Sequence, residues 1–263
     1  MSNDFLHLII HQIEDVSWVQ INRPGDRNSL NSELIAELIR LIESTEGTSI
    51  RAIVFRGMGE TYFIGGADGV EMHLFSPPEA RAFSISIQNL FNRMEASPLL
   101  MVAAINGLCF GGGYEFALAC DFRVASKRAR IGLPEVKVGI IPGGGGTQRL
   151  SRLVGMGKAL KIILSGHLYS GEEALELGLV HYLVEDQELE KKTVEILRKI
   201  FAIPQHALSS AKKAIYASQY LPFDQGLKVE TEEFGKCFTY DIFSKLIKEQ
   251  LKDGRLKTTL RWQ

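Results

Sequence analysis

The sequence predicts an α/β protein with one large domain followed by a helical tail. Short apolar segments of strand length alternate with amphipathic helical segments through about the first 200 residues. Beyond Pro204 the pattern is helical only, so we expect a domain over residues 1–204 and a helical region over residues 205–263. A strand–helix–strand alternation favours crossover connections, and therefore a mixed or parallel sheet.

The first elements follow from turn and capping residues. Residues 6–13 and 16–21 are predicted strands that form a hairpin around Glu14-Asp15. Asn31 is a suitable N-cap for a helix with one apolar face, formed by Leu34, Ile35, Leu38, Ile39 and Ile42. Residues 50–55 are the next strand, which ends before Gly57 and Gly59.

The middle of the chain begins with a glycine-bearing loop over residues 61–69, which contains Gly65 and Gly66. A long helix is expected over residues 79–95. An apolar run over 99–105 is a buried strand, and the next helix is expected after Gly113, from Glu115 onward. The remaining expected elements are helices over 155–164, 170–178, 188–200 and 205–218, a strand over 179–184, and helix from 223 to the end.

The composition is that of an ordinary soluble globular protein. Hydrophobic residues make up 45% and charged residues 23% of 263 residues, and the mean hydropathy is +0.02. A net charge of −1 favours neither nucleic acid nor an anionic membrane as a partner. The three cysteines suggest reduced thiols. No apolar run reaches the length of about 18 residues that a membrane span needs. Because the N-terminus also lacks a signal or transit pattern, we expect a cytoplasmic protein.

Two glycine-rich turns each lie beside a glutamate. Gly111-Gly112-Gly113 precedes Glu115, and Pro134-Glu135 leads to Gly143–Gly146. A glycine run between a strand and a helix lets backbone N–H groups approach a ligand at the positive end of the helix dipole. Such a turn can hold a developing negative charge, although a tight turn without a ligand has the same pattern. The spacing matches neither a P-loop nor G-x-G-x-x-G.

These residues carry a resemblance to a known family. Asn106-Gly107, the Gly111–Glu115 segment, Cys120-Asp121, Pro134-Glu135 and Ile141–Leu150 resemble the signature of the enoyl-CoA hydratase, or crotonase, family. The segment Phe63–Asp68 is similar to the loop that carries the first oxyanion donor in that family. The motifs match in order and spacing, and the resemblance runs from about residue 16 to about residue 184.

The resemblance implies a crotonase-like spiral of ββα turns, followed by a C-terminal helical region that makes trimer contacts. It implies addition of water to a 2-enoyl-CoA thioester, with no cofactor besides the acyl-CoA substrate. The N–H groups of Ala67 and Gly112 would stabilise the enolate oxygen. Glu135 would be the main acid/base, while Glu115 would orient and help activate the water. The implied substrate and CoA contacts are Arg27, Gly65, Gly66, Ala67, Asp68 and Gly112.

Other functions stay open at this point. A Δ3-Δ2 isomerase of the same superfamily generally lacks one or both glutamates, whereas a dehydratase acting on another acyl thioester uses the same residues. One branch of the family binds RNA through a lysine-rich helix, but here residues 79–95 contain only Arg81 and Arg93 as bases. The six histidines show no metal-ligand spacing, so no metal is expected.

The C-terminal region departs from the usual hydratase pattern. It contains Phe238–Phe243 and ends in Lys257–Gln263, which leaves the acyl preference open. Large apolar residues recur along this tail, and a projecting tail has little core of its own in which to bury them. We therefore expect a homotrimer, or a hexamer made of two trimers. The apolar markers are Ile215, Leu221, Phe223, Leu227, Phe234, Phe238, Phe243, Leu246 and Leu251.

Overall fold

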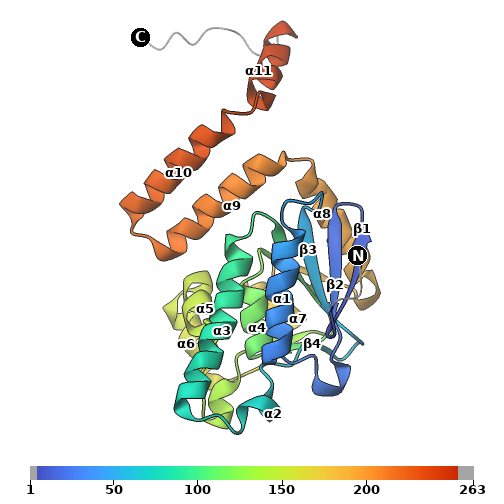
Figure 1. Ribbon diagram of the computed structural model, residues 1–263, viewed down its shortest axis with the longest axis vertical. Coiled ribbons are helices and arrows are strands. Elements are labelled where there is room, and N and C mark those ends of the chain that lie inside the picture. The colour runs from blue at the N-terminus through green and yellow to red at the C-terminus, as the bar shows by residue number, and fades with distance from the viewer. Residues whose placement is uncertain (1–4, 254–263) are drawn as a thin grey trace. The chain divides into compact units, whose positions relative to one another are not determined.

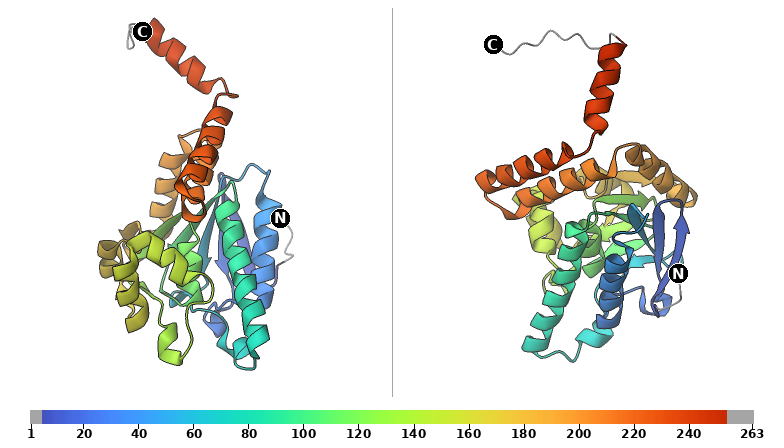
Figure 2. Two further views of the ribbon diagram at one scale, coloured as in Figure 1. Left: turned by 90° about the vertical axis from the view of Figure 1, so that its left-hand side faces the viewer. Right: turned by 45° about the horizontal axis from the view of Figure 1, so that its top comes forward.

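A computed structural model describes residues 5–253 of the chain (Figures 1 and 2). The chain divides into two compact units, Met1–Ala202 and Ile203–Gln263. Within the described residues the first unit is mixed α/β and the second is helical, which confirms the predicted class. Part of the expected C-terminal helix, including the segment from Lys257 to Gln263, lies outside the described residues.

Within residues 5–253, the larger sheet of the first unit has six strands in the order β1-β2-β3-β5-β7-β10. β1 and β2 form the predicted antiparallel hairpin, and every other neighbouring pair is parallel. The strands are β1 (Leu8–Ile13), β2 (Val16–Ile21), β3 (Ala52–Gly57), β5 (Leu100–Ile105), β7 (Phe122–Ser126) and β10 (Tyr182–Val184).

The smaller sheet of the described chain has four short strands in the order β4-β6-β8-β9. β4, β6 and β8 are parallel neighbours, and β9 pairs antiparallel with β8. Their bounds are β4 (Tyr62–Ile64), β6 (Leu108–Phe110), β8 (Arg130–Gly132) and β9 (Tyr169–Ser170). Along the chain, β3-β4, β5-β6 and β7-β8 each place one strand in each sheet before the next helix. This repeat is the predicted ββα spiral.

Several helix ends follow directly from the sequence. Asn31 caps α1 (Ser32–Thr45), because its Oδ1 accepts a hydrogen bond of 2.9 Å from the Leu34 N–H. Ser170 and Glu173 form a capping box at the start of α7 (Gly171–Leu177). α3 begins two residues earlier than predicted and spans Pro77–Ala96, with a capping box between Ser76 and Glu79. The other helices of the unit are α2 (Gly69–Met72), α4 (Gly112–Leu118), α5 (Gly146–Val154), α6 (Met156–Ser165) and α8 (Leu189–Phe201).

The six-stranded sheet is apolar on both faces. One face, with Ile53, Phe55 and Met101, packs into the main core together with residues of α1, α3 and α4. The opposite face, with Trp18, Val54 and Val102, packs with Leu189 and Leu197 of α8. Burial on both faces explains why the central strands are almost continuously apolar in sequence.

The second unit contains α9 (Gln205–Tyr220), α10 (Phe223–Cys237) and α11 (Ile242–Lys252). Glu233 joins α9 to α10, since its carboxylate lies 2.7 Å from Lys213 Nζ and accepts a hydrogen bond of 3.0 Å from Ser210 Oγ. These contacts hold the pKa of Glu233 at about 2. Across the described residues, every helix is too short or too polar to serve as a membrane span.

Candidate active site

Three loops that follow β4, β6 and β8 carry the predicted site residues. Ala67 follows β4, Gly112 follows β6, and Glu135 follows β8. Because these three strands are adjacent and parallel, the loops after them emerge at the same edge of the smaller sheet. The spiral therefore brings together residues that are far apart in the sequence.

The N–H group of Ala67, in the loop after β4, is the first of the two predicted oxyanion donors. Ala67 pairs with Leu30 in a parallel bridge, in which Leu30 N–H donates to Gly66 O and Asp68 N–H donates to Leu30 O. In this pattern the N–H of Ala67 points away from Leu30. Within residues 5–253 it donates to no acceptor.

The second N–H belongs to the first residue of α4. The helix begins at Gly112, not after Gly113 as predicted, because tertiary packing overrides the low helix propensity of glycine. A Cβ on Gly113 would lie only 2.0 Å from Ile64 O, so glycine is required where α4 approaches β4. A Cβ on Gly112 would lie 3.0 Å from the Ala67 nitrogen, and a Cβ on Gly66 would lie 4.0 Å from the Gly112 nitrogen, so the two backbone segments are packed against each other.

Glu115 lies one turn into α4 and is buried. Its Oε1 accepts a hydrogen bond of 2.7 Å from the N–H of Gly146. Burial raises the pKa of Glu115 above its ordinary value, and the N–H groups of Gly146 and Gly144 and the charge of Arg149 offset only part of this rise. These donors provide the solvation that an ionised carboxylate loses when it leaves water.

Within the described chain, Glu135 lacks the backbone donors of a neighbouring loop that contact Glu115. It begins the short 3-10 helix η2 (Glu135–Val138), and both of its carboxylate oxygens are buried. Among the described residues it is the one acid whose two oxygens are both buried without a hydrogen-bond partner. Burial is the main reason that the pKa of Glu135 is raised to about 7; the dipole of its own backbone N–H lowers the pKa, and the nearby charge of Glu115 raises it. A Cβ on Gly111 would lie 3.4 Å from Glu135 Oε1, so this carboxyl group faces the turn that carries Gly112.

The raised pKa of Glu135 predicts a pH-dependent stability. The pKa is about 7 when folded and about 4.5 when unfolded, so the native state binds more protons between these values. The stability contributed by this group is therefore lost as pH rises from about 4.5 to about 7. Glu135→Gln has no carboxyl group to ionise, so it avoids the cost of ionising this buried group in the folded protein. Its free energy of unfolding, relative to that of the unchanged protein, should therefore increase by about 3 kcal/mol from pH 4 to pH 8. Urea unfolding of both proteins at the two pH values measures this difference, and a difference independent of pH would contradict it.

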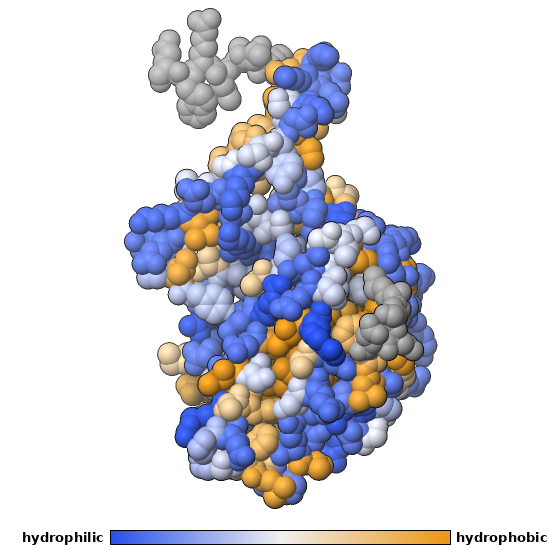
Figure 3. Space-filling model, viewed as in Figure 1, coloured by the Kyte–Doolittle hydropathy of each residue, from blue (hydrophilic) through white to orange (hydrophobic). Residues whose placement is uncertain are grey.

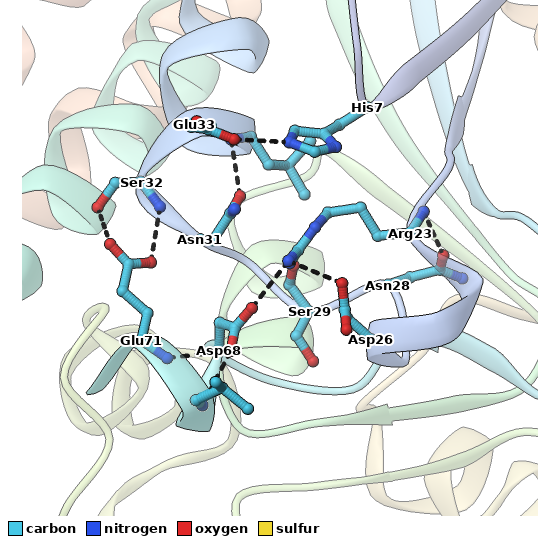
Figure 4. A network of polar contacts seen from close by, with 12 residues as sticks. His7, Arg23, Asp26, Asn28, Ser29, Asn31, Ser32, Glu33, Asp68 and Glu71 are labelled. Carbon is cyan, nitrogen blue, oxygen red and sulfur yellow. Dashed lines mark hydrogen bonds and ion pairs between the residues drawn. The ribbon is translucent and has the colours of Figure 1, made fainter. Parts of the chain in front are cut away.

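Asp68 is held by contacts with the start of α2 and with Arg23 (Figure 4). Its carboxylate accepts hydrogen bonds from the N–H groups of Val70 and Glu71 and forms an ion pair of 2.9 Å with Arg23. Glu71 in turn binds Ser32 at the start of α1. Asp68 thus anchors the loop that presents Ala67, with its carboxylate directed at Arg23 and the start of α2.

Arg27, in the loop after β2, contacts Gly65 in the loop after β4. Arg27 is exposed and has a left-handed backbone, and its carbonyl accepts a hydrogen bond of 2.9 Å from Gly65 N–H. Gly66 has a φ of +100°, a conformation that L side chains rarely adopt. The structure therefore places Arg27 and Gly65 against each other, directly before the segment that ends in Ala67.

Some features of the site have no signal in the sequence pattern. The N–H groups of Gly144 and Gly146 contact Glu115 from a loop that we predicted only as a glycine-rich turn. Tyr114, which follows the glycine run, is fully buried and donates a hydrogen bond of 3.1 Å to Leu179 O, so it belongs to the core. Within residues 5–253, no group of three or more His, Cys, Asp or Glu side chains is arranged to hold a metal ion.

Comparison with known proteins gives a consistent result. The family model for enoyl-CoA hydratase/isomerase matches residues 12–251. The chain is 42% identical over 234 residues to the short-chain-enoyl-CoA hydratase of Clostridium acetobutylicum, covering 89% of this chain and 90% of that protein. It is 35% identical over 233 residues to the crotonyl-CoA hydratase of Syntrophomonas wolfei subsp. wolfei, covering 88% and 90% of the two chains.

A solved structure has the same fold. The crystal structure of enoyl-CoA hydratase from Bacillus anthracis matches with a TM-score of 0.87 at 34% identity, over 94% of this chain and 96% of that chain. The fold implied by the sequence motifs is thereby confirmed.

Proposed function

The chain belongs to the enoyl-CoA hydratase/isomerase family, and we infer that it is an enoyl-CoA hydratase. The reaction is the reversible addition of water to a 2-trans-enoyl-CoA thioester, which gives the 3-hydroxyacyl-CoA. The substrate is an acyl-CoA, and the proposed chemistry uses no further cofactor.

The first part of the mechanism is stabilisation of charge on the thioester oxygen. As water adds at C3, negative charge moves to this oxygen and an enolate forms. Within residues 5–253 the N–H groups of Ala67 and Gly112 donate to no acceptor, and their positions are fixed by the bridge to Leu30 and by the start of α4. We assign them as the two donors to the enolate oxygen. Because both donors are already in place, they stabilise the negative charge without any reorganisation of the protein.

The second part is proton transfer by the two glutamates. Glu135, with a pKa of about 7, carries a proton in a large share of molecules near neutral pH and can deliver it to C2. Glu115 is held by backbone N–H groups, so its carboxylate is fixed, orients the attacking water and accepts the proton that this water loses as its oxygen bonds to C3. Release of that proton from Glu115 to solvent and uptake of one proton by Glu135 from solvent then restore both groups. The two groups differ in their hydrogen-bonding environment, which gives each a separate role.

One observation carries this proposal. Glu135 keeps two buried oxygens without a protein partner directly beside the Gly111-Gly112 turn. Burying such a carboxyl group is costly unless a ligand or reaction uses it. A panel of C4 to C16 2-enoyl-CoA esters, followed by loss of the conjugated thioester absorbance, tests the activity. No loss with any ester, for a folded protein, would overturn it.

Two other reactions of the superfamily lead to different outcomes in this assay. An isomerase would move the double bond of a Δ3-enoyl-CoA and create the conjugated absorbance. The presence of both Glu115 and Glu135 argues against that reaction, because the isomerase branch generally lacks one or both of these glutamates. A dehydratase would use the same residues, and a carrier-protein thioester tested beside the CoA ester separates it from a CoA-dependent hydratase.

We also propose that the helical unit joins copies of the chain into a homotrimer, or a hexamer made of two trimers. Its helices expose large apolar side chains, including Phe223 at 83%, Phe234 at 66% and Ile215 at 65% exposure. Phe238 contacts both Phe234 and Phe243, which forms an aromatic cluster between α10 and α11. Figure 3 shows apolar side chains among the polar ones over these helices. Exposed apolar surface of this kind is typical of an interface.

The assembly gives a direct prediction. Light scattering of the intact chain at micromolar concentration should yield three or six times the mass of one chain, because burying each large apolar side chain contributes roughly 1.5–3 kcal/mol. Removal of the residues after Pro204 should give insoluble or inactive protein. A stable mass of a single chain would contradict the proposal.

We further propose a reducing compartment, the cytoplasm, for this enzyme. All three cysteines are free thiols, and Cys109 and Cys120 are buried in the core. Burial raises the pKa of the Cys109 thiol well above its ordinary value, so it stays protonated.

A further inference from the structure

The loop of residues 143–146 is attached to one face of α3. The carbonyl of Gly143 accepts hydrogen bonds of 2.7 Å from Ser84 Oγ and 2.8 Å from Gln88 Nε2. Ser84 and Gln88 lie one helical turn apart, so they present their donors on the same face. The loop is therefore held at its first residue by a regular helix.

Arg149 holds the next residue of this loop. Its Nη1 donates a hydrogen bond of 3.0 Å to Gly144 O, and its Nε lies 2.6 Å from Glu95 Oε1. Its Nη2 donates a hydrogen bond of 2.8 Å to Asn92 Oδ1. The side chains of Arg149 and Glu95 are only 12% and 6% exposed, so this ion pair is shielded from solvent. A guanidinium with three fixed acceptors defines one geometry, which a lysine cannot reproduce.

The residues held in this way surround Glu115. A Cβ on Gly144 would lie 2.9 Å from Glu115 Oε2, and a Cβ on Gly146 would lie 2.9 Å from Glu115 Oε1. The backbone of the loop thus lies against both oxygens of the carboxylate. A shift of the loop would remove the Gly146 N–H from its 2.7 Å hydrogen bond to Glu115.

We propose that Arg149, anchored by Glu95 and Asn92, is a positioning residue of this site that keeps the loop of residues 143–146 closed on Glu115. The inference rests on the proposed hydratase function, in which Glu115 holds the attacking water. Within residues 5–253, two titratable groups interact with Glu115, Glu135 from η2 and Arg149 from α5, and Glu95 from α3 forms an ion pair with Arg149. The positive charge of Arg149 also lowers the pKa of Glu115, so its loss favours the protonated form.

The test compares Arg149→Gln with the unchanged protein in two measurements. In hydration of a C4 enoyl-CoA, kcat should fall roughly tenfold to a hundredfold, because the water-holding carboxylate is displaced, while KM changes little. The acid limb of the pH–rate profile should move to higher pH. In carbon-13 NMR of carboxyl-labelled glutamate, the Glu115 signal, assigned with Glu115→Gln, should titrate at higher pH than in the unchanged protein.

Two further variants keep the test decisive if Arg149→Gln does not fold. Arg149→Lys retains the charge without the three-way geometry, so it should restore the acid limb but only part of kcat. Glu95→Gln removes the ion pair that anchors Arg149, so it should also lower kcat. Arg152→Gln is the matched control, because Arg152 lies on α5 and bonds to Gln148; it should leave kcat and the pH profile unchanged.

The outcomes separate this proposal from the hydratase function. Folded Arg149 and Glu95 variants with unchanged kcat and an unchanged Glu115 titration would overturn the positioning role. A loss of kcat without any change in the titration or the pH profile would also overturn it, since a general structural defect has that effect. If the unchanged protein hydrates no enoyl-CoA, the proposed function fails, while the NMR titration still reports on Arg149.

Discussion

Glu135→Gln should lower hydration of a 2-enoyl-CoA by roughly two orders of magnitude or more while the protein remains folded. Glutamine has nearly the shape of glutamate but cannot deliver a proton to C2. The fold should tolerate the change, because neither oxygen of Glu135 accepts a hydrogen bond from the described residues. Turnover measured by loss of conjugated absorbance, with circular dichroism as a check on folding, gives the result.

Two variants accompany this measurement. Glu115→Gln should cause a comparable loss, because the attacking water is no longer held by a charged carboxylate. Glu176→Gln, an exposed position on α7, is the control and should have normal turnover. Near-normal turnover of folded Glu135→Gln would remove this residue from the mechanism. If Glu135 mattered and Glu115 did not, the isomerase reaction would be favoured instead.

Gly112→Pro is expected to have the second large effect, a loss of roughly 10²–10³ in kcat, because it deletes one of the two N–H donors. Gly112 is the first residue of α4, and proline is well tolerated at the first helical position. The helix should therefore form, while the oxyanion loses a donor and the added ring crowds the Ala67 nitrogen.

The matched control is Gly69→Pro at the first residue of α2. Asp68 before it has an extended backbone, with φ −71° and ψ 103°, which suits a residue preceding proline. Nothing lies within 4 Å of a Cβ at Gly69. This variant should retain activity, whereas an active and folded Gly112→Pro would show that the Gly112 N–H is not a donor.

The longer elements of the fold could be predicted because their ends carry local signals. Asn31 and Ser170 cap their helices through side-chain hydrogen bonds, and Gly178 ends α7 with a left-handed backbone. The strands of the smaller sheet could not be predicted separately. β6 and β8 have three residues each and β9 has two, too few to show any periodicity. They are strands because their neighbours in the spiral pair with them.

Part of the site can likewise be predicted from local sequence, and part depends on tertiary contacts. The glycine turns and the two glutamates are visible in the sequence, since their residue types and spacing are unusual. The pair of Arg149 and Glu95 is not, because 54 residues separate its members and either side chain would suit an exposed helix. The pKa of Glu135 also depends on burial by residues distant in sequence. Tertiary structure alone creates these properties.

The origin of the oxygen at C3 of the product distinguishes hydration from every other reaction of the superfamily. The protein is incubated with crotonyl-CoA in water enriched in heavy oxygen, and the product is examined by mass spectrometry. A hydratase gives a 3-hydroxyacyl-CoA that carries one solvent oxygen at C3, formed as the conjugated absorbance disappears. A product of unchanged mass, or no product from a folded protein, would contradict the hydratase function.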